Sequence, residues 1–290
     1  MRGLLHPRSS STLVYRRLNA LASPRNNGWN EYGGPCYQCE AHHALQVTPL
    51  ALSAAEEVAQ RLTETGRIDY DVDPRDAHPA LDISEVWTKG PGRMFGVLTL
   101  RRREHDHDVV VLKAFSGQMA NFWVIPGWVG PVAQLTHESS VYQSYRTEIE
   151  GLSKEIHRLE PTDERVPLLK SSRKRLSHEL LFAIQSSYTV RGRENQAQGL
   201  VEVYNNSCAY VGCREKRRRA VASFPAGTGD CCAPKLIHAA TRLVRENGYE
   251  MEGMVEFWYG KNKGNTNHLN VYGPCEKCRL ILGPLLCGFL

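Results

Sequence analysis

Alternation of apolar and polar residues predicts both helices and strands in the first half of the chain. A capping box, Ser-Ala-Ala-Glu, opens a segment with helical spacing and predicts a helix over residues 53–65. Two β-like runs, residues 94–100 and 109–115, flank a charged segment and predict a hairpin. The aromatic segment 122–132 contains prolines and glycines that prevent regular structure. It is either a loop that covers the sheet or an exposed surface on which bases stack.

Residues 139–190 carry the pattern of two long helices. Apolar residues recur three and four positions apart from Tyr142 to Leu159, which is the spacing of a coiled-coil seam. Pro161 ends the first helix, and a second helix with one apolar stripe begins near Leu168. We expect the two helices to form an antiparallel coiled-coil hairpin, an arm that is suited to recruiting a protein partner.

The C-terminal part of the chain predicts a helix, a strand and a second helix. The first helix has Asp230 as its N-cap and Gly248 as its stop. Residues 251–259 alternate like a strand, and Pro274 then begins the last helix. Together with the hairpin, these elements predict an α/β domain in which helices flank a sheet.

Composition is that of a globular protein. The 290 residues are 41% hydrophobic and 23% charged, which excludes disorder throughout. No stretch approaches the roughly 18 to 20 apolar residues that a membrane span needs, so we expect no contact with a membrane. The elements predict one domain over residues 46–290, interrupted at 139–190, after a tail over residues 1–45.

The formal net charge of +5 is concentrated in the N-terminal tail. Five of the 36 basic residues lie in residues 1–30, which contain no acidic residue, so the remaining chain balances its 31 acidic residues. An arginine- and serine-rich start without acidic residues is typical of an organelle transit peptide, but it also fits a disordered tail. We therefore expect an intracellular protein, either in a mitochondrion or plastid or in the cytoplasm.

One basic run lies within the body of the chain. Clustered cations neutralise phosphates without reading bases, so this run predicts contact with RNA, although a solvated loop explains it equally well. The five cationic residues are Arg214, Lys216, Arg217, Arg218 and Arg219.

Nine cysteines exceed what packing requires, and several occur at short spacings. Cys275 and Cys278 form one Cys-x-x-Cys pair, and Cys231 lies at the start of another predicted helix. The partial positive charge of a helix N-terminus favours the thiolate that zinc requires. We expect these three residues to bind zinc, with Cys232 or His238 as a fourth ligand. A redox dithiol and unrelated packing cysteines remain alternatives.

A second group of ligand-type residues follows the tail. Cys36, Cys39, His42 and His43 form a compact Cys-x-x-Cys-x-x-His-His cluster. The cluster is shorter than a zinc finger, and we consider it a second, weaker candidate for a zinc knuckle.

The order of these C-terminal motifs resembles the zinc-dependent nucleoside and nucleobase deaminases. Their signature has a zinc ligand, a catalytic glutamate two residues later, and then Pro-Cys-x-x-Cys. Some members read Cys-Ala-Glu-Pro-Lys-Leu, whereas this chain reads Cys-Cys-Ala-Pro-Lys-Leu from Cys231, with Ala233 at the glutamate position. The resemblance implies a three-layer deaminase-like fold. Either Glu256 or Asp230 replaces the carboxylate, or the site binds without turnover; both residues also have simple structural explanations, as an exposed strand residue and an N-cap.

Several blocks after residue 45 carry a second resemblance. They are PLALSAAEEV, MFGVLTL, AFSGQMAN, RKRLSHEL, PAGTGDCCAPKLIHAA, MVEFWYG and YGPCEKCRLILGPLLCG. In this order they are similar to the N-terminal extension of long bacterial pseudouridine synthases of the RluA type. The catalytic Arg-Leu-Asp motif of those enzymes does not occur in this sequence. The resemblance therefore implies a module associated with RNA modification rather than an isomerase.

From the sequence alone, we expect a zinc- and RNA-binding accessory module without its own catalysis. The alternatives are an active zinc-dependent deaminase with a displaced carboxylate and an interaction protein that uses the helical arm.

Overall fold

The computed structural model describes residues 30–135, 139–191, 196–212 and 224–290. The arginine-rich start of the chain and the basic run of residues 214–219 lie outside these ranges, so the predictions made for them stay predictions. Within the described ranges, no helix is both long and apolar enough to cross a membrane.

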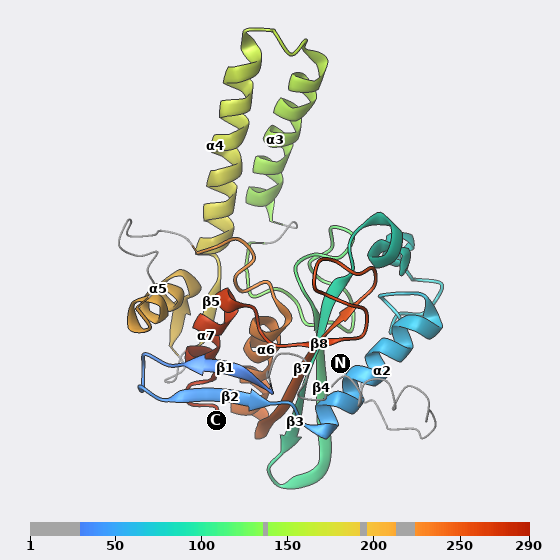
Figure 1. The fold of residues 1–290 in the computed structure, drawn as a ribbon, viewed down its shortest axis with the longest axis vertical. Helices are drawn as coiled ribbons and strands as arrows, with labels where there is room; N and C mark the ends of the chain where they lie inside the picture. The colour runs from blue at the N-terminus through green and yellow to red at the C-terminus, as the bar shows by residue number, and fades with distance from the viewer. Residues whose placement is uncertain (1–29, 136–138, 192–195, 213–223) are drawn as a thin grey trace.

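A four-stranded antiparallel sheet forms the centre of the molecule (Figure 1). Its strands are β3 (Arg93–Arg102), β4 (His105–Phe115), β7 (Tyr249–Tyr259) and β8 (Val271–Tyr272), in the order β4-β3-β7-β8. The predicted hairpin is confirmed as β3 and β4, although its strands extend into the charged segment that separates the two runs. The predicted C-terminal strand is β7, and it pairs with β3 along most of its length.

Helices cover both faces of this sheet, which gives three layers (Figure 1). α2 (Pro49–Thr65) packs against β3 and β7 on one face, and α6 (Cys232–Asn247) packs on the other face. α7 (Glu276–Leu286) lies beside α6. Side chains of β7 point to both faces of the sheet. Phe257 belongs to the apolar core under α2, and Met254 belongs to the core under α6.

An N-terminal hairpin belongs to the folded domain and corrects the predicted boundary at residue 46. β1 (Glu31–Pro35) and β2 (His42–Gln46) pair with each other and pack against α7. This close packing depends on glycine, because a methyl group on Gly283 would collide with the backbone carbonyl oxygens of Gly34 and Pro35. The predicted tail of residues 1–45 therefore includes most of a folded strand pair. The prediction missed it because the strand pair lies close to the arginine-rich start of the chain.

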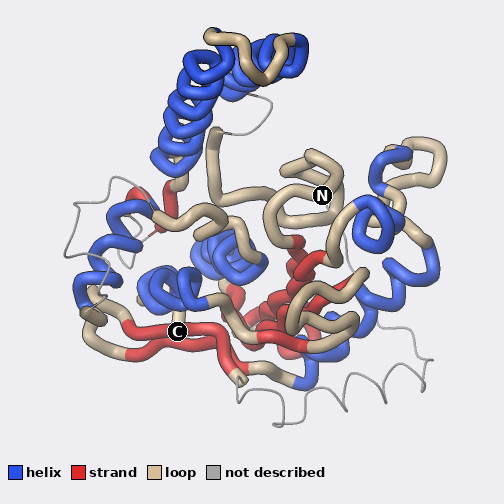
Figure 2. The backbone as a smooth tube through the Cα atoms, turned by 45° about the horizontal axis from the view of Figure 1, so that its top comes forward, coloured by secondary structure: helices blue, strands red, loops and turns tan. Residues whose placement is uncertain are grey.

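Two long helices form the predicted arm. α3 (Ser140–Arg158) and α4 (Arg165–Ser186) pack against each other and project from the rest of the molecule (Figures 1 and 2). α4 begins three residues before the predicted start at Leu168. None of the α3 residues is buried, so this helix adds little to the core of the domain. The coiled-coil seam and a protein partner for the arm stay predictions.

The aromatic segment 122–132 is a loop that covers the sheet. Ile125 and Trp128 are buried in the core under α2, and the Trp128 indole donates a hydrogen bond of 2.8 Å to the backbone oxygen of Ile68. The Trp128 ring also packs against Phe95, with ring centroids 5.4 Å apart. Burial of these side chains favours the covering loop over an exposed stacking surface.

Shorter elements connect these layers. They are a 3₁₀ turn (Pro79–Leu81), a π-helical turn (Glu85–Lys89), β5 (Thr189–Arg191), β6 (Ala197–Gly199) and α5 (Leu200–Tyr210).

The true helix starts differ from those predicted. α2 begins four residues earlier than predicted, and Thr48 rather than Ser53 is its N-cap, since the Thr48 side chain accepts a hydrogen bond from the Ala51 amide. Cys231 rather than Asp230 is the N-cap of α6. Cys275 is the N-cap of α7, so this helix begins two residues after the predicted start at Pro274. A sequence pattern predicts that a helix is present more reliably than it predicts the residue at which the helix begins.

The Gly283 contact gives a test of the hairpin packing. We expect Gly283→Ala to lower the free energy of unfolding by about 2 kcal/mol, because the new methyl group overpacks the β1 backbone. Gly151→Ala in α3 is the matched control, since nothing lies within 4 Å of its new methyl group. That variant should gain up to about 1 kcal/mol from helix propensity. Urea denaturation measures both changes, and equal effects of the two variants would contradict the packing.

Candidate metal centre

Three thiols from two helix starts meet at one edge of the sheet. Cys231 and Cys275 are the N-caps of α6 and α7, and Cys278 lies in the first turn of α7. Their sulfur atoms all lie within 4.8 Å of one another, and the Sγ atoms of Cys231 and Cys275 are 3.7 Å apart. Tetrahedral coordination by zinc at about 2.3 Å places sulfur atoms about 3.8 Å apart. The predicted convergence of these three residues is confirmed, and their geometry fits a metal ion.

The chain path explains this convergence. α6 ends at Gly248, which adopts the left-handed conformation, and β7 then returns the chain to the edge of the sheet where α6 begins. The start of α6 is fixed there by Lys235, whose buried ammonium group donates hydrogen bonds of 2.9 Å to the backbone oxygens of Phe115 and Gly117. The start of α6 is therefore held by the sheet rather than by the cysteines.

The three thiols share their protons unequally. Hydrogen bonds from Cys231 and Cys278 lower the pKa of the Cys275 thiol, which favours its thiolate. Hydrogen bonding to Cys275 raises the pKa of Cys231. Hydrogen bonding and burial also raise the pKa of Cys278. A metal ion that binds here displaces the thiol protons, because cysteine binds metals as the thiolate.

Neither predicted fourth ligand belongs to the group. The Cys232 thiol is buried against the sheet, where it lies 3.3 Å from the backbone oxygen of Met94. His238 lies on the second turn of α6, away from the helix start, and burial lowers its pKa. Among the described residues, Cys231, Cys275 and Cys278 are the whole ligand set of this group. Three protein ligands leave one position for water or substrate, as in catalytic rather than structural zinc sites.

Glu256 is buried beside this group instead of exposed on its strand. Its side chain is 3% exposed, and Oε1 accepts a hydrogen bond of 2.6 Å from the Ala233 amide. Burial raises the pKa of Glu256 to about 8, the Ala233 amide opposes this shift, and the nearby charge of Cys275 adds to it. The Glu256 carboxylate thus contacts the backbone amide of Ala233, the residue that stands at the glutamate position of the deaminase motif.

Asp230 is not a helix cap. Its carboxylate accepts a hydrogen bond from the Tyr188 hydroxyl, and its backbone oxygen accepts one of 2.8 Å from the Gly117 amide. Burial raises the pKa of the Asp230 carboxyl group. The residue therefore joins the start of α6 to the loop that follows β4.

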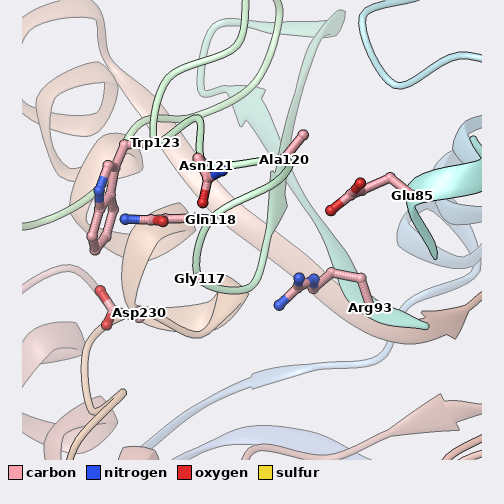
Figure 3. A pocket seen from close by; sticks show the side chains of 8 residues that line it. All are labelled: Glu85, Arg93, Gly117, Gln118, Ala120, Asn121, Trp123 and Asp230. Atoms are coloured by element: carbon pink, nitrogen blue, oxygen red, sulfur yellow. The ribbon is translucent and has the colours of Figure 1, made fainter. Parts of the chain in front are cut away.

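A polar cavity of about 410 Å³ lies near the start of α6 (Figure 3). Asp230, which directly precedes Cys231, forms part of its wall, and the loop after β4 forms another part. Figure 3 shows Asp230 and Trp123 on one side of this cavity and Arg93 and Glu85 on the other. The full lining is Glu85, Arg93, Gly117, Gln118, Ala120, Asn121, Trp123 and Asp230. Sequence reasoning identified only Asp230, because no local pattern marks the others.

A second group brings together Cys36, Cys39, His43 and Cys287, whose ligand atoms also lie within 4.8 Å of one another. The structure brings the first three of these residues together, as the sequence predicted. It was wrong for His42, whose Nε2 lies 2.9 Å from Glu31 on the opposite face of the β1–β2 pair. It also missed Cys287, which is more than 240 residues away in the sequence.

Comparison of the chain with protein-family models, with curated proteins and with solved structures finds no match. The function is therefore argued from the geometry of the site.

One cysteine of α7, Cys278, and one of α6, Cys232, test the ligand assignment. We expect Cys278→Ser to lose the metal ion at the three-cysteine group, because the variant removes a buried thiolate ligand. Cys232→Ser should keep the ion, since its side chain faces the sheet. Metal analysis of the purified chains measures both. Loss of metal in the Cys232 variant, with retention in the Cys278 variant, would contradict the assignment.

Proposed function

We propose that this protein is a zinc-dependent hydrolase of the deaminase type, in which Glu256 replaces the missing motif glutamate. The observation that carries this proposal is the 2.6 Å hydrogen bond from the Ala233 amide to the Glu256 carboxylate, beside a three-cysteine group with an open position. The sequence alone favoured binding without turnover, because Ala233 stands at the glutamate position. A carboxylate delivered from β7 removes that objection.

Cys231, Cys275 and Cys278 would hold the zinc ion. Zinc in such a site supplies a Lewis acid that lowers the pKa of water to about 7. The two oxygens of Glu256 then have different tasks. Oε1 is held by the Ala233 amide. Oε2 would take a proton from the attacking water and give it to the ring nitrogen of the base. It would then pass the proton of the newly added hydroxyl group to the amino group, which would leave as ammonia, so the carboxylate would end the cycle unchanged.

Burial of Glu256 supports a chemical role over a purely structural one. A buried carboxylate with few partners costs folding free energy, and such groups cluster at functional sites. The shifted pKa of about 8 also places this group near neutral pH, where a carboxylate can both accept and return a proton.

The cavity that Asp230 lines supports a nucleobase as the substrate. Its volume of about 410 Å³ lies in the range of small-ligand sites. The side-chain amides of Gln118 and Asn121 offer donors and acceptors for the edge of a base, and the Trp123 indole offers a face for stacking. The resemblance to extensions of pseudouridine synthases favours a base within RNA, and the basic run of residues 214–219 supplies a phosphate contact in this proposal.

The test is release of ammonia from nucleosides and from short single-stranded RNAs by the full zinc-loaded chain. We expect conversion of cytosine or adenine bases, with the product identified by mass spectrometry. Glu256→Gln should lower the rate by about 10² to 10⁴ while the zinc content stays unchanged, because the amide still accepts the Ala233 hydrogen bond but transfers no proton.

Glu252→Gln is the matched control on the same strand. Glu252 lies four residues before Glu256 on β7 and forms an ion pair of 3.0 Å with Arg101, so this variant should keep the full rate. If the wild-type chain binds zinc and releases no ammonia from any of these substrates, the proposal is wrong, and binding without turnover is the better account.

A further inference from the structure

We propose that Cys36, Cys39, His43 and Cys287 bind a second, structural zinc ion that fastens the N-terminal hairpin to the end of α7. The four ligand atoms lie within 4.8 Å of one another. The Sγ atoms of Cys39 and Cys287 are 3.6 Å apart, close to the roughly 3.8 Å expected between sulfur ligands of tetrahedral zinc. Three thiolates and one imidazole are a common ligand set for structural zinc.

The turn between β1 and β2 has the conformation of a metal-binding knuckle. The Cys36 amide donates a hydrogen bond of 2.8 Å to the backbone oxygen of Ala41, which closes the turn. The Gln38 amide points at the Cys36 sulfur, 3.4 Å away. Glu40 adopts a left-handed conformation with φ of 59°, which costs free energy for a residue other than glycine. A bound ion that draws Cys36 and Cys39 together offsets this cost.

Four protein ligands make this group a closed site, in contrast to the three-cysteine group. Cys36 and Cys287 are fully buried, and Cys39 and His43 are partly buried. A site with all four tetrahedral positions filled by protein holds zinc for stability, since no position remains for water. The two groups therefore predict two different roles for the same metal.

The hairpin and α7 meet closely enough to complete this site. Cys287 directly follows α7, and the paired glycines Gly34 and Gly283 allow the β1 backbone to approach that helix. The same helix carries Cys275 and Cys278 at its start. An 11-residue helix is about 16 Å long, so one helix links the two metal groups.

The hairpin also reaches Glu256. The Tyr32 hydroxyl on β1 accepts a hydrogen bond of 2.6 Å from the Glu256 amide and donates one of 2.6 Å to the backbone oxygen of Tyr272. Tyr32 is 1% exposed. A zinc ion that fixes the hairpin therefore also fixes the backbone beside the three-cysteine group, although the second site does not depend on any activity there.

The experiment counts zinc in the full chain by mass spectrometry after dialysis against a weak chelator. We expect two ions per chain in the wild type and one in both His43→Ala and Cys287→Ser. His42→Ala is the matched control, because its side chain pairs with Glu31, and it should keep two ions. His43→Cys restores four ligands and should also keep two. Cys278→Ser should lose the other ion, and the double variant Cys278→Ser/Cys287→Ser should lose both.

The thermal midpoint provides a readout that is independent of activity. Cys287→Ser should unfold at a lower temperature than the wild type, whereas Cys278→Ser should show a smaller shift, because only the second ion fastens the hairpin. A wild-type zinc content that His43→Ala and Cys287→Ser both leave unchanged overturns the proposal, whereas a single ion that these variants lose and Cys278→Ser keeps contradicts only the three-cysteine site. A disulfide between Cys39 and Cys287, detected as two thiols protected from alkylation in the denatured chain without reductant, also overturns it.

Discussion

The arrangement of the candidate site depends on how α6 and α7 begin at the same edge of the sheet. β7 carries the chain from the end of α6 back to this edge, so the N-termini of both helices face one point. Lys235 anchors the start of α6 to the backbone after β4 by two buried hydrogen bonds. Each helix start carries partial positive charge, which favours a thiolate where they meet, and the pKa of Cys275 is lowered there by its two cysteine neighbours.

Three other features follow from this meeting point. The loop after β4 lies against Asp230 and forms the wall of the polar cavity. β7 brings Glu256 under the first turn of α6, where its carboxylate meets an amide that has no partner within the helix. At its other end, α7 places Cys287 against the N-terminal hairpin. The helical arm is separate from this arrangement, as no residue of α3 is buried.

Periodic patterns predicted most of the central fold. The alternating runs that became β3, β4 and β7 are buried on one or both faces, so their composition follows their position in the sheet. The helix starts were less predictable, because Asp230 and Ser53 fit the pattern of a cap as well as the residues that cap the helices. The β1–β2 hairpin was missed because its strands are short and their packing depends on glycines, which carry no hydrophobic signal.

The sites show the same limit. Cys231, Cys275 and Cys278 could be predicted because each lies at a recognisable helix start. Cys287 and Glu256 could not, because only the tertiary fold brings them to Cys39 and Ala233. No sequence pattern distinguishes His42 from His43 as a ligand. The pleat of β2 distinguishes them, because it turns neighbouring side chains to opposite faces.

The most direct test of the account is a crystal structure of the zinc-loaded chain with anomalous diffraction data collected at the zinc absorption edge. We expect an anomalous peak about 2.3 Å from the sulfur atoms of Cys231, Cys275 and Cys278. No peak between these three residues, or a sulfur–sulfur bond of about 2.05 Å between two of them, would contradict it.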